Sequence, residues 1–253
     1  MIKTDQRDAV VLLTLDRPEK RNSLHPDMIR DLSSELEKVE SDASTKVVVI
    51  AGAGTTFCAG LDLTHLLRLD TNAKIQYLRT FFSLFRQIYT LPQPVIACIN
   101  GAAIAGGFDL ALACDLRLCS PEATFAQTEI LLGLTQLLYP LYKVVGLGRA
   151  KELAMTGQSI SAEEAFRMGL VNRVCPVDTL SSETMRLAQL LASRPTEALF
   201  ATKRLSREVI EMTTDMAIER MFDRISERLQ SEEHQHHSAL YLSELKRQQR
   251  THK

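Results

Sequence analysis

The stretch Pro94–Cys119, PVIACINGAAIAGGFDLALACDLRLC, constrains the fold more than any other part of the sequence. Val95–Ile99 is a short apolar run rich in β-branched residues behind a proline, which predicts a buried strand. Asn100-Gly101 and Ala105-Gly106-Gly107 are turn signals, and Phe108–Cys114 is apolar enough to form a buried helix. The stretch therefore predicts a strand, a glycine turn, a helix and a second strand in succession.

A helix that begins at Gly106-Gly107 points unpaired N–H groups, and the positive end of its dipole, at whatever precedes it. Gly106 has no Cβ, so a ligand oxygen can approach its N–H closely. This is the geometry of an anion or oxyanion site. Asp109 follows in the first turn of this helix, and Glu129 comes later in the chain. We expect the molecule to be organised around these three features.

The order of strand, small-residue loop and helix occurs twice, at residues 47–67 and 95–114. Other strands are expected over 9–15, 123–127 and 170–174, and a loop over 129–133. Helices are expected from residue 26 and over 75–91, 137–145 and 150–155. Another is expected over 161–169, beginning with a capping box from Ser161 to Glu164, and Asp62 is the expected N-cap of a helix that starts LTHLL. From residue 178 onward helical patterns dominate. Alternation followed by helices alone predicts an α/β core, residues 1–195, and a C-terminal helical region, residues 196–253.

The first of the two loops is Phe57–Asp62, FCAGLD, and each loop can present one backbone N–H group. If the loops face each other, the N–H groups of Leu61 and Gly106 can both donate to the carbonyl oxygen of a thioester. They would then stabilise the enolate that forms when the carbon beside the carbonyl gains or loses a proton. One such donor is typically worth about 3 kcal/mol.

Composition and charge limit which classes of partner and which cellular compartment are expected. The net charge is −1, from 30 basic and 31 acidic residues, so no general affinity for nucleic acid or an anionic membrane is implied. The longest apolar region, 95–118, is interrupted by Asn100, Asp109 and Asp115, which argues against a membrane span. The N-terminus lacks a signal-peptide pattern, and the five cysteines form no C-x-x-C pair. A reducing, cytoplasmic setting is therefore expected.

Six segments, in order, carry a family resemblance: Arg17–Leu24, Phe57–Leu63, Asn100–Asp115, Phe125–Gly133, Gly146–Thr156 and Ala162–Val174. Together they resemble the crotonase, or enoyl-CoA hydratase/isomerase, superfamily, over roughly residues 5–240. Several coincident motifs are far more specific than any one of them.

The resemblance implies a spiral ββα core with a C-terminal helical trimerisation region, in a homotrimer or a dimer of trimers. It also implies an acyl-CoA substrate and no metal or redox cofactor, since coenzyme A is part of the substrate. The catalytic residues that it implies are Glu129, Asp109, Leu61 and Gly106. The implied substrate-binding residues are Ala59, Leu61, Asp62, Leu63, Thr64, Gly106 and Leu137, with Lys20 and Arg21 near the nucleotide end.

At the two carboxylates, Asp109 and Glu129, this sequence differs from the subgroups of the family that it resembles. The hydratases that the chain resembles have glutamate at both positions that match Asp109 and Glu129, and the two glutamates hold a water between them. Here the first position is Asp109, whose side chain is shorter. Dienoyl-CoA isomerases pair aspartate with glutamate, but they carry a third acid where this chain has Leu137. An apolar Leu137 suits proton transfer by Glu129 alone. Hydration of a 2-enoyl-CoA and a Δ3-Δ2 or dienoyl double-bond shift therefore both stay open.

Other interpretations compete with this one. Asp109 can serve only to complement the helix dipole, and Glu129 can be a structural ion-pair partner. A non-catalytic scaffold that binds acyl-CoA or RNA is the alternative of another class; the near-neutral charge disfavours RNA. His234, His236 and His237 lie in a polar helix with no second cluster of ligands, so no metal site is expected.

Overall fold

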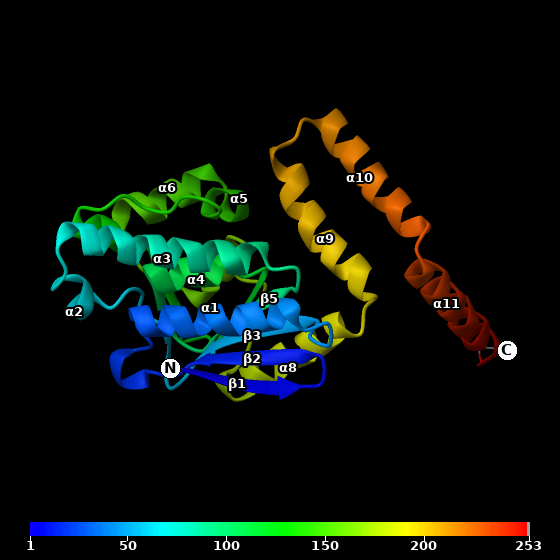
Figure 1. Cartoon of the computed structure of the whole chain (residues 1–253), viewed down its shortest axis with the longest axis horizontal. Helices are drawn as coiled ribbons and strands as arrows, with labels where there is room; N and C mark the ends of the chain where they lie inside the picture. The colour runs from blue at the N-terminus through cyan, green and yellow to red at the C-terminus, as the bar shows by residue number, and fades with distance from the viewer. Residues whose placement is uncertain (252–253) are drawn as a thin grey trace. The chain divides into compact units, whose positions relative to one another are not determined.

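The computed structural model describes residues 1–251 of the chain (Figure 1). It divides into two compact units, the first being Met1–Gln189 and the second beginning at Leu190. The division expected from the sequence, between residues 195 and 196, lies a few residues further along. The last two residues of the expected helical region, 252 and 253, lie outside the described residues.

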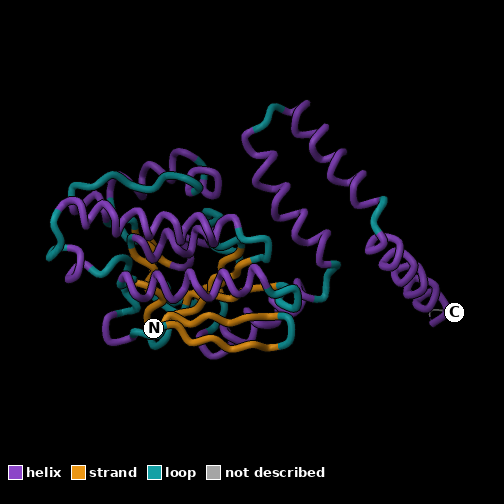
Figure 2. Tube along the Cα trace, viewed as in Figure 1, coloured by secondary structure: helices purple, strands orange, loops and turns teal. Residues whose placement is uncertain are grey.

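The first unit is built on a six-stranded sheet, whose strands are drawn in orange in Figure 2. Its order is β1(Ile2–Arg7), β2(Val10–Leu15), β3(Val47–Gly52), β5(Val95–Ile99), β7(Leu116–Cys119) and β10(Arg173–Val174). Strand β1 is antiparallel to β2, and the later pairs are parallel. Strand β5, the predicted buried strand, is buried along its whole length, as expected for a central parallel strand.

Strand β1 was not expected, because its sequence IKTDQR has no apolar alternation. It lies at the edge of the sheet, where it pairs with β2 alone and its side chains are mostly exposed. An edge strand of this kind needs no apolar face of its own, so its hydrogen bonds to β2 determine its conformation.

A second, smaller sheet contains β4(Thr56–Cys58), β6(Ala102–Ile104), β8(Thr124–Ala126) and β9(Ile160–Ser161), in that order. The first three strands are parallel, with Cys58 opposite Ala103 and Ile104 opposite Ala126. Parallel strands end at one edge of a sheet. The loops after β4, β6 and β8 therefore leave this edge side by side, and these loops carry residues 59–62, 105–107 and 127–129.

The helices of the first unit are α1(Pro26–Ser41), α2(Leu63–Leu66), α3(Thr71–Thr90), α4(Gly106–Ala113), α5(Leu141–Val145), α6(Leu147–Thr156), α7(Ala162–Arg167) and α8(Val177–Ala192), which ends just beyond the unit. Helix α1 packs against β1 and β2, and α3 packs against α1 and α4 (Figure 1). Phe57, Phe108 and Phe125 are fully buried between these elements. The short 3₁₀ turns are η1(Pro18–Lys20) and η2(Glu129–Leu132).

Two local expectations around Glu129 are wrong. Residues 129–132 form the 3₁₀ turn η2 instead of an open loop. The helix expected over 137–145 begins only at Leu141, after Pro140. Proline has no N–H to donate inside a helix and disfavours helical backbone at the residue before it. Residues 137 and 138 are therefore irregular, and residues 139 and 140 form a turn.

The second unit consists of α9(Thr196–Glu208), η3(Val209–Glu211), α10(Thr214–Leu229) and α11(Glu232–Thr251). Glu208 pairs with Arg220 and Arg224, which joins α9 to α10. Glu233 accepts hydrogen bonds from the first N–H groups of α9, at Glu197 and Ala198, and so joins α9 to α11. Of the helices in residues 1–251, none has the length and apolar composition needed to cross a membrane.

Candidate active site

A cavity of about 240 Å³ lies where the three loops of the small sheet meet α2, α3 and α4. Asp109 and Glu129 are the two acids in its wall. The other lining residues are neutral and mostly apolar: Ala59, Leu61, Leu63, Leu66, Leu78, Phe81, Phe82, Ala105, Gly106, Thr128, Leu132, Leu134, Thr135 and Leu137. Seven of the residues expected from the sequence thus line one cavity: Ala59, Leu61, Leu63, Gly106, Asp109, Glu129 and Leu137.

The loops after β4 and β6 are in close contact at this cavity. A Cβ placed on Gly60 would lie 3.0 Å from the backbone nitrogen of Gly106, and one placed on Gly106 would lie 3.6 Å from the nitrogen of Leu61. Gly60 has a φ of +86°, a conformation open to glycine at little cost. Among the hydrogen bonds of residues 1–251, neither the Leu61 nor the Gly106 N–H has a protein acceptor. The structure thus brings two uncommitted donors into the wall of one cavity.

Ala105, directly before α4, has φ 51° and ψ −126°, which L-residues rarely adopt and which costs about 1–3 kcal/mol. Its N–H donates to Ala126 on the end of β8, at 2.8 Å, and its carbonyl accepts from Asp109, at 3.0 Å. These two bonds hold the strained residue in place. The backbone therefore turns sharply enough for α4 to begin at the cavity wall.

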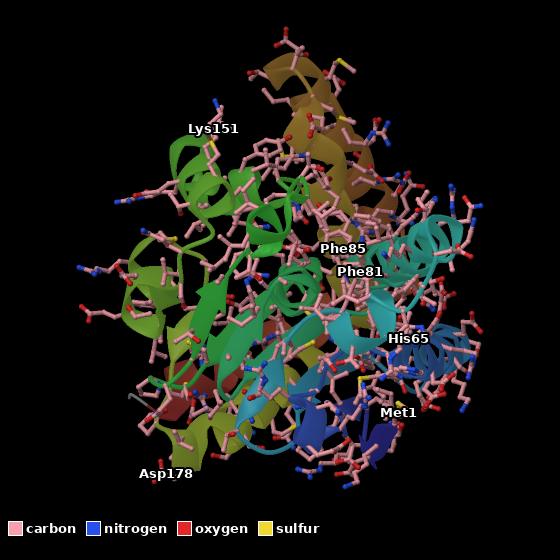
Figure 3. The ribbon with its side chains drawn as sticks, turned by 90° about the vertical axis from the view of Figure 1, so that its left-hand side faces the viewer. Met1, His65, Phe81, Phe85, Lys151 and Asp178 are labelled. Carbon is pink, nitrogen blue, oxygen red and sulfur yellow. The ribbon has the colours of Figure 1, made fainter. Side chains whose placement is uncertain are left out.

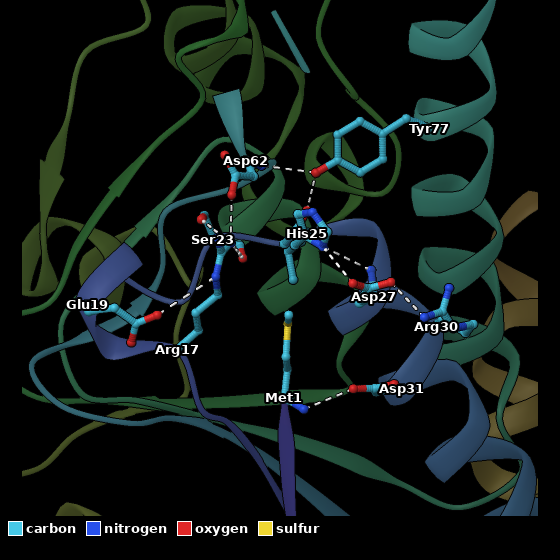
Figure 4. Close-up of polar contacts among 11 residues, drawn as sticks. Met1, Arg17, Glu19, Ser23, His25, Asp27, Arg30, Asp31, Asp62 and Tyr77 are labelled. Atoms are coloured by element: carbon cyan, nitrogen blue, oxygen red, sulfur yellow. Dashed lines mark hydrogen bonds and ion pairs between the residues drawn. The ribbon is translucent and has the colours of Figure 1, made fainter. Parts of the chain in front are cut away.

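The loop after β4 is held from outside by a network of polar contacts (Figure 4). The Tyr77 hydroxyl donates to the Leu24 carbonyl and accepts from the Asp62 N–H. The Asp62 carboxylate caps α2 by accepting from His65 N–H, and it pairs with Arg17 at 2.6 Å. Asp62 is thus an N-cap, as the sequence predicts, and it does not line the cavity.

The environment of the cavity shifts the pKa values of both carboxyl groups. Asp109 is 4 % exposed, and burial together with the charge of Glu129 raises the pKa of Asp109 well above its usual value. Burial also raises the pKa of Glu129. Glu129 Oε2 is buried and accepts no hydrogen bond from the described part of the chain. In a low-dielectric cavity, two facing carboxyls favour a state in which one of them keeps a proton.

Three residues expected to bind substrate are exposed and lie outside the cavity wall: Lys20, Arg21 and Thr64. The carbonyl of Arg21 accepts from Ala59 N–H at 3.0 Å, so the backbone of the basic loop supports the loop after β4. Contact of these side chains with the coenzyme A arm stays a prediction.

Several lining residues were missed at the level of sequence. Leu78, Phe81 and Phe82 come from α3, and Figure 3 labels Phe81 on this helix. The apolar spacing predicts the helix, but nothing local says which part of it lies over the cavity. Leu132, the last residue of η2, and Leu134, just after it, also line the cavity. Among residues 1–251, no group of three or more His, Cys, Asp or Glu side chains is placed to hold a metal ion.

Comparisons with known proteins agree on one family. The model of a family described as enoyl-CoA hydratase/isomerase matches residues 5–250. The short-chain-enoyl-CoA hydratase of Clostridium acetobutylicum is 31 % identical over 218 residues, 85 % of this chain and 84 % of that protein. The 2,3-dehydroadipyl-CoA hydratase of Escherichia coli is 34 % identical over 213 residues, 82 % of each chain. The crystal structure of enoyl-CoA hydratase from Bacillus anthracis superposes with a TM-score of 0.89 at 32 % identity, covering 91 % and 92 % of the two chains.

Proposed function

Since this chain belongs to the enoyl-CoA hydratase/isomerase family of acyl-CoA-transforming enzymes and has the crotonase fold, we propose that it hydrates a 2-enoyl-CoA thioester with Glu129 as principal acid and base. One observation carries this proposal. A single cavity is lined by two N–H groups and two carboxyls. Within the described residues, 1–251, neither N–H group has a protein acceptor, and one buried oxygen of Glu129 accepts no hydrogen bond.

In the proposed reaction, the thioester oxygen accepts hydrogen bonds from the Leu61 and Gly106 N–H groups. These donors stabilise the negative charge that develops on this oxygen as the enolate forms. Donors fixed in a dry site are already oriented before the reaction, and removing one such donor costs about 3–4 kcal/mol. The apolar lining from Leu78, Phe81 and Leu137 supports this step, because it keeps the local dielectric constant low.

The proton transfers fall to the two carboxyls. Glu129 takes a proton from water as the water oxygen bonds to the β carbon of the enoyl group, and the α carbon receives a proton from the carboxyl pair. The raised pKa of Glu129 suits this role, since a general base works best when its pKa is near the operating pH. Asp109 assists by holding a proton or by orienting the water.

A double-bond isomerase is the second candidate, and the position of Leu137 favours it. Leu137 lies in the cavity wall with Asp109 and Glu129 and offers a water molecule no side-chain hydrogen bond. In an isomerase, Glu129 alone would remove a proton from one carbon of the acyl chain and return it to another, without water.

The test is turnover of crotonyl-CoA, followed as loss of conjugated enoyl absorbance, beside turnover of a 3-enoyl-CoA, followed as gain of that absorbance. Hydration of crotonyl-CoA, reduced about 10²- to 10⁴-fold in Glu129→Gln, is the expected result. Turnover of the 3-enoyl-CoA alone would establish the isomerase. Binding of acyl-CoA with no turnover by the folded protein would establish the non-catalytic scaffold.

We also propose a homotrimer, or a dimer of trimers, in the cytoplasm, with acyl-CoA as ligand and with no metal or redox cofactor in the reaction. The outer face of α10 supports self-association, since Ile218, Phe222, Ile225 and Leu229 are each more than half exposed there at a helical spacing. All five cysteines are free and buried, which suits a reducing compartment. Sedimentation of the purified protein tests the oligomeric state.

A further inference from the structure

Gln127 is a fully buried residue directly after β8 that no part of the proposed chemistry uses. It does not line the cavity. Its side-chain Nε2 donates to Asp109 Oδ1 at 3.2 Å and to the Leu137 carbonyl at 3.0 Å. Both partners are oxygen acceptors, so the NH₂ end of the amide must face them. Both side-chain hydrogens of Gln127 are thus committed to two residues of the cavity wall.

A second hydrogen bond strengthens this connection. Gln136 Nε2 donates to the backbone carbonyl of Gln127 at 3.3 Å. The segment that leads into Glu129 is therefore joined to residues 136 and 137, while the Gln127 side chain joins it to α4. Residues 134–138, before α5, form no helix or strand. These hydrogen bonds, together with packing of Leu137 against the core, therefore hold Leu137 in place.

The hydrogen bond from Gln127 also affects where Asp109 carries a proton and how readily Asp109 ionises. Because Gln127 donates to Oδ1, a proton carried by Asp109 belongs on Oδ2. The donation stabilises the ionised carboxylate, so it lowers the pKa of Asp109 against the opposite effects of burial and of Glu129. Loss of this donor would make Asp109 harder to ionise.

We propose that Gln127 is a positioning residue for the reaction. It holds the Asp109 carboxyl in one orientation and fixes the position of Leu137 relative to Asp109. The inference rests on the proposed function, because it assigns Gln127 a role only through Asp109 and the wall of that same site.

Gln127→Met tests the inference, because methionine has nearly the same length and no N–H to donate. We expect kcat to fall about ten- to a hundredfold, as for a misplaced catalytic group. KM should change less than about threefold, since Gln127 does not line the cavity. The limb of the pH–rate profile that belongs to Asp109, identified as the limb that Asp109→Asn abolishes, should move to higher pH.

Gln93→Met is the matched control. Gln93 is also a buried glutamine of the first unit, 3 % exposed, and its amide donates to the Val39 carbonyl. Neither residue lines the cavity. This variant should lose stability without any shift of the pH–rate profile. In an Asp109→Asn background, adding Gln127→Met should lower kcat less than about twofold further, because the two residues act as one unit.

The outcomes separate the inference from the proposed function. If the wild-type protein turns over neither substrate, the proposed function fails and the inference falls with it. If the wild-type protein is active but Gln127→Met keeps the wild-type pH–rate profile, or lowers kcat equally with and without Asp109, the inference alone is overturned. If Gln127→Met does not fold, Gln127→Asn, whose shorter amide cannot reach both acceptors, is subjected to the same measurements.

Discussion

Replacing Gly106 with alanine tests the proposed oxyanion site with little disturbance of the fold. A Cβ on Gly106 would lie 3.3 Å from Phe81 Cζ, 3.6 Å from Gly60 Cα and 3.6 Å from the Leu61 nitrogen. Only the contact with the Phe81 ring is tighter than usual, and the edge of that ring must move by a few tenths of an ångström. Alanine also favours a helix over glycine by up to about 1 kcal/mol, so the free energy of unfolding should change by less than about 1 kcal/mol.

The catalytic effect should be much larger. A thioester oxygen that accepts from both Leu61 and Gly106 must lie about 3 Å from each nitrogen. The added methyl group would occupy space between these two nitrogens. The oxygen would lose at least one donor, so kcat/KM should fall about 10²- to 10³-fold, equivalent to about 3–4 kcal/mol.

The assay is kcat/KM for crotonyl-CoA or the 3-enoyl-CoA, with stability measured by urea unfolding. Gly148→Ala on α6 is the matched control, since its Cβ would meet nothing within 4 Å; it should leave activity unchanged. Gly107→Ala is the contrasting case, because its Cβ would lie 2.1 Å from the Cys58 carbonyl oxygen and should prevent folding. A folded Gly106→Ala protein with kcat/KM within about threefold of wild type would refute the oxyanion site.

Two further predictions concern stability. The pKa of Asp109 is raised in the folded state. Between about pH 4 and that raised pKa, Asp109 is ionised in the unfolded chain but keeps its proton in the folded protein, so the free energy of unfolding falls as pH rises. Asp109→Asn should therefore stabilise the protein increasingly from pH 5 to pH 8 in urea titrations, and parallel curves would contradict this. Arg17→Met leaves the buried Asp62 carboxylate without its partner and should cost about 3 kcal/mol. Arg149→Met, which breaks an exposed pair, should cost almost nothing, and equal losses for the two variants would be evidence against the structural role of Asp62.

The sequence predicts well wherever a structure depends on neighbouring residues. The start of α4 at Gly106, the capping of α2 by Asp62 and the capping box from Ser161 to Glu164 all follow from local patterns. Such features depend on hydrogen bonds that span only a few residues. The family resemblance adds the identity of the site residues, and the family and the fold are confirmed by the comparisons.

By itself, then, the sequence determined the α/β class, the two glycine loops and the presence of the two carboxyls, because each depends on a short stretch of chain. Only the tertiary structure decided that the loops meet. The strands that bring them together, β4, β6 and β8, are three residues each. Local pattern predicts β8, but β4 and β6 are too short to be recognised, and no local pattern says that the three strands pair. Likewise, the bonds of Gln127 to Asp109 and Leu137 span 18 and 10 residues of chain, and contacts at such separations exist only after the small sheet has aligned its strands.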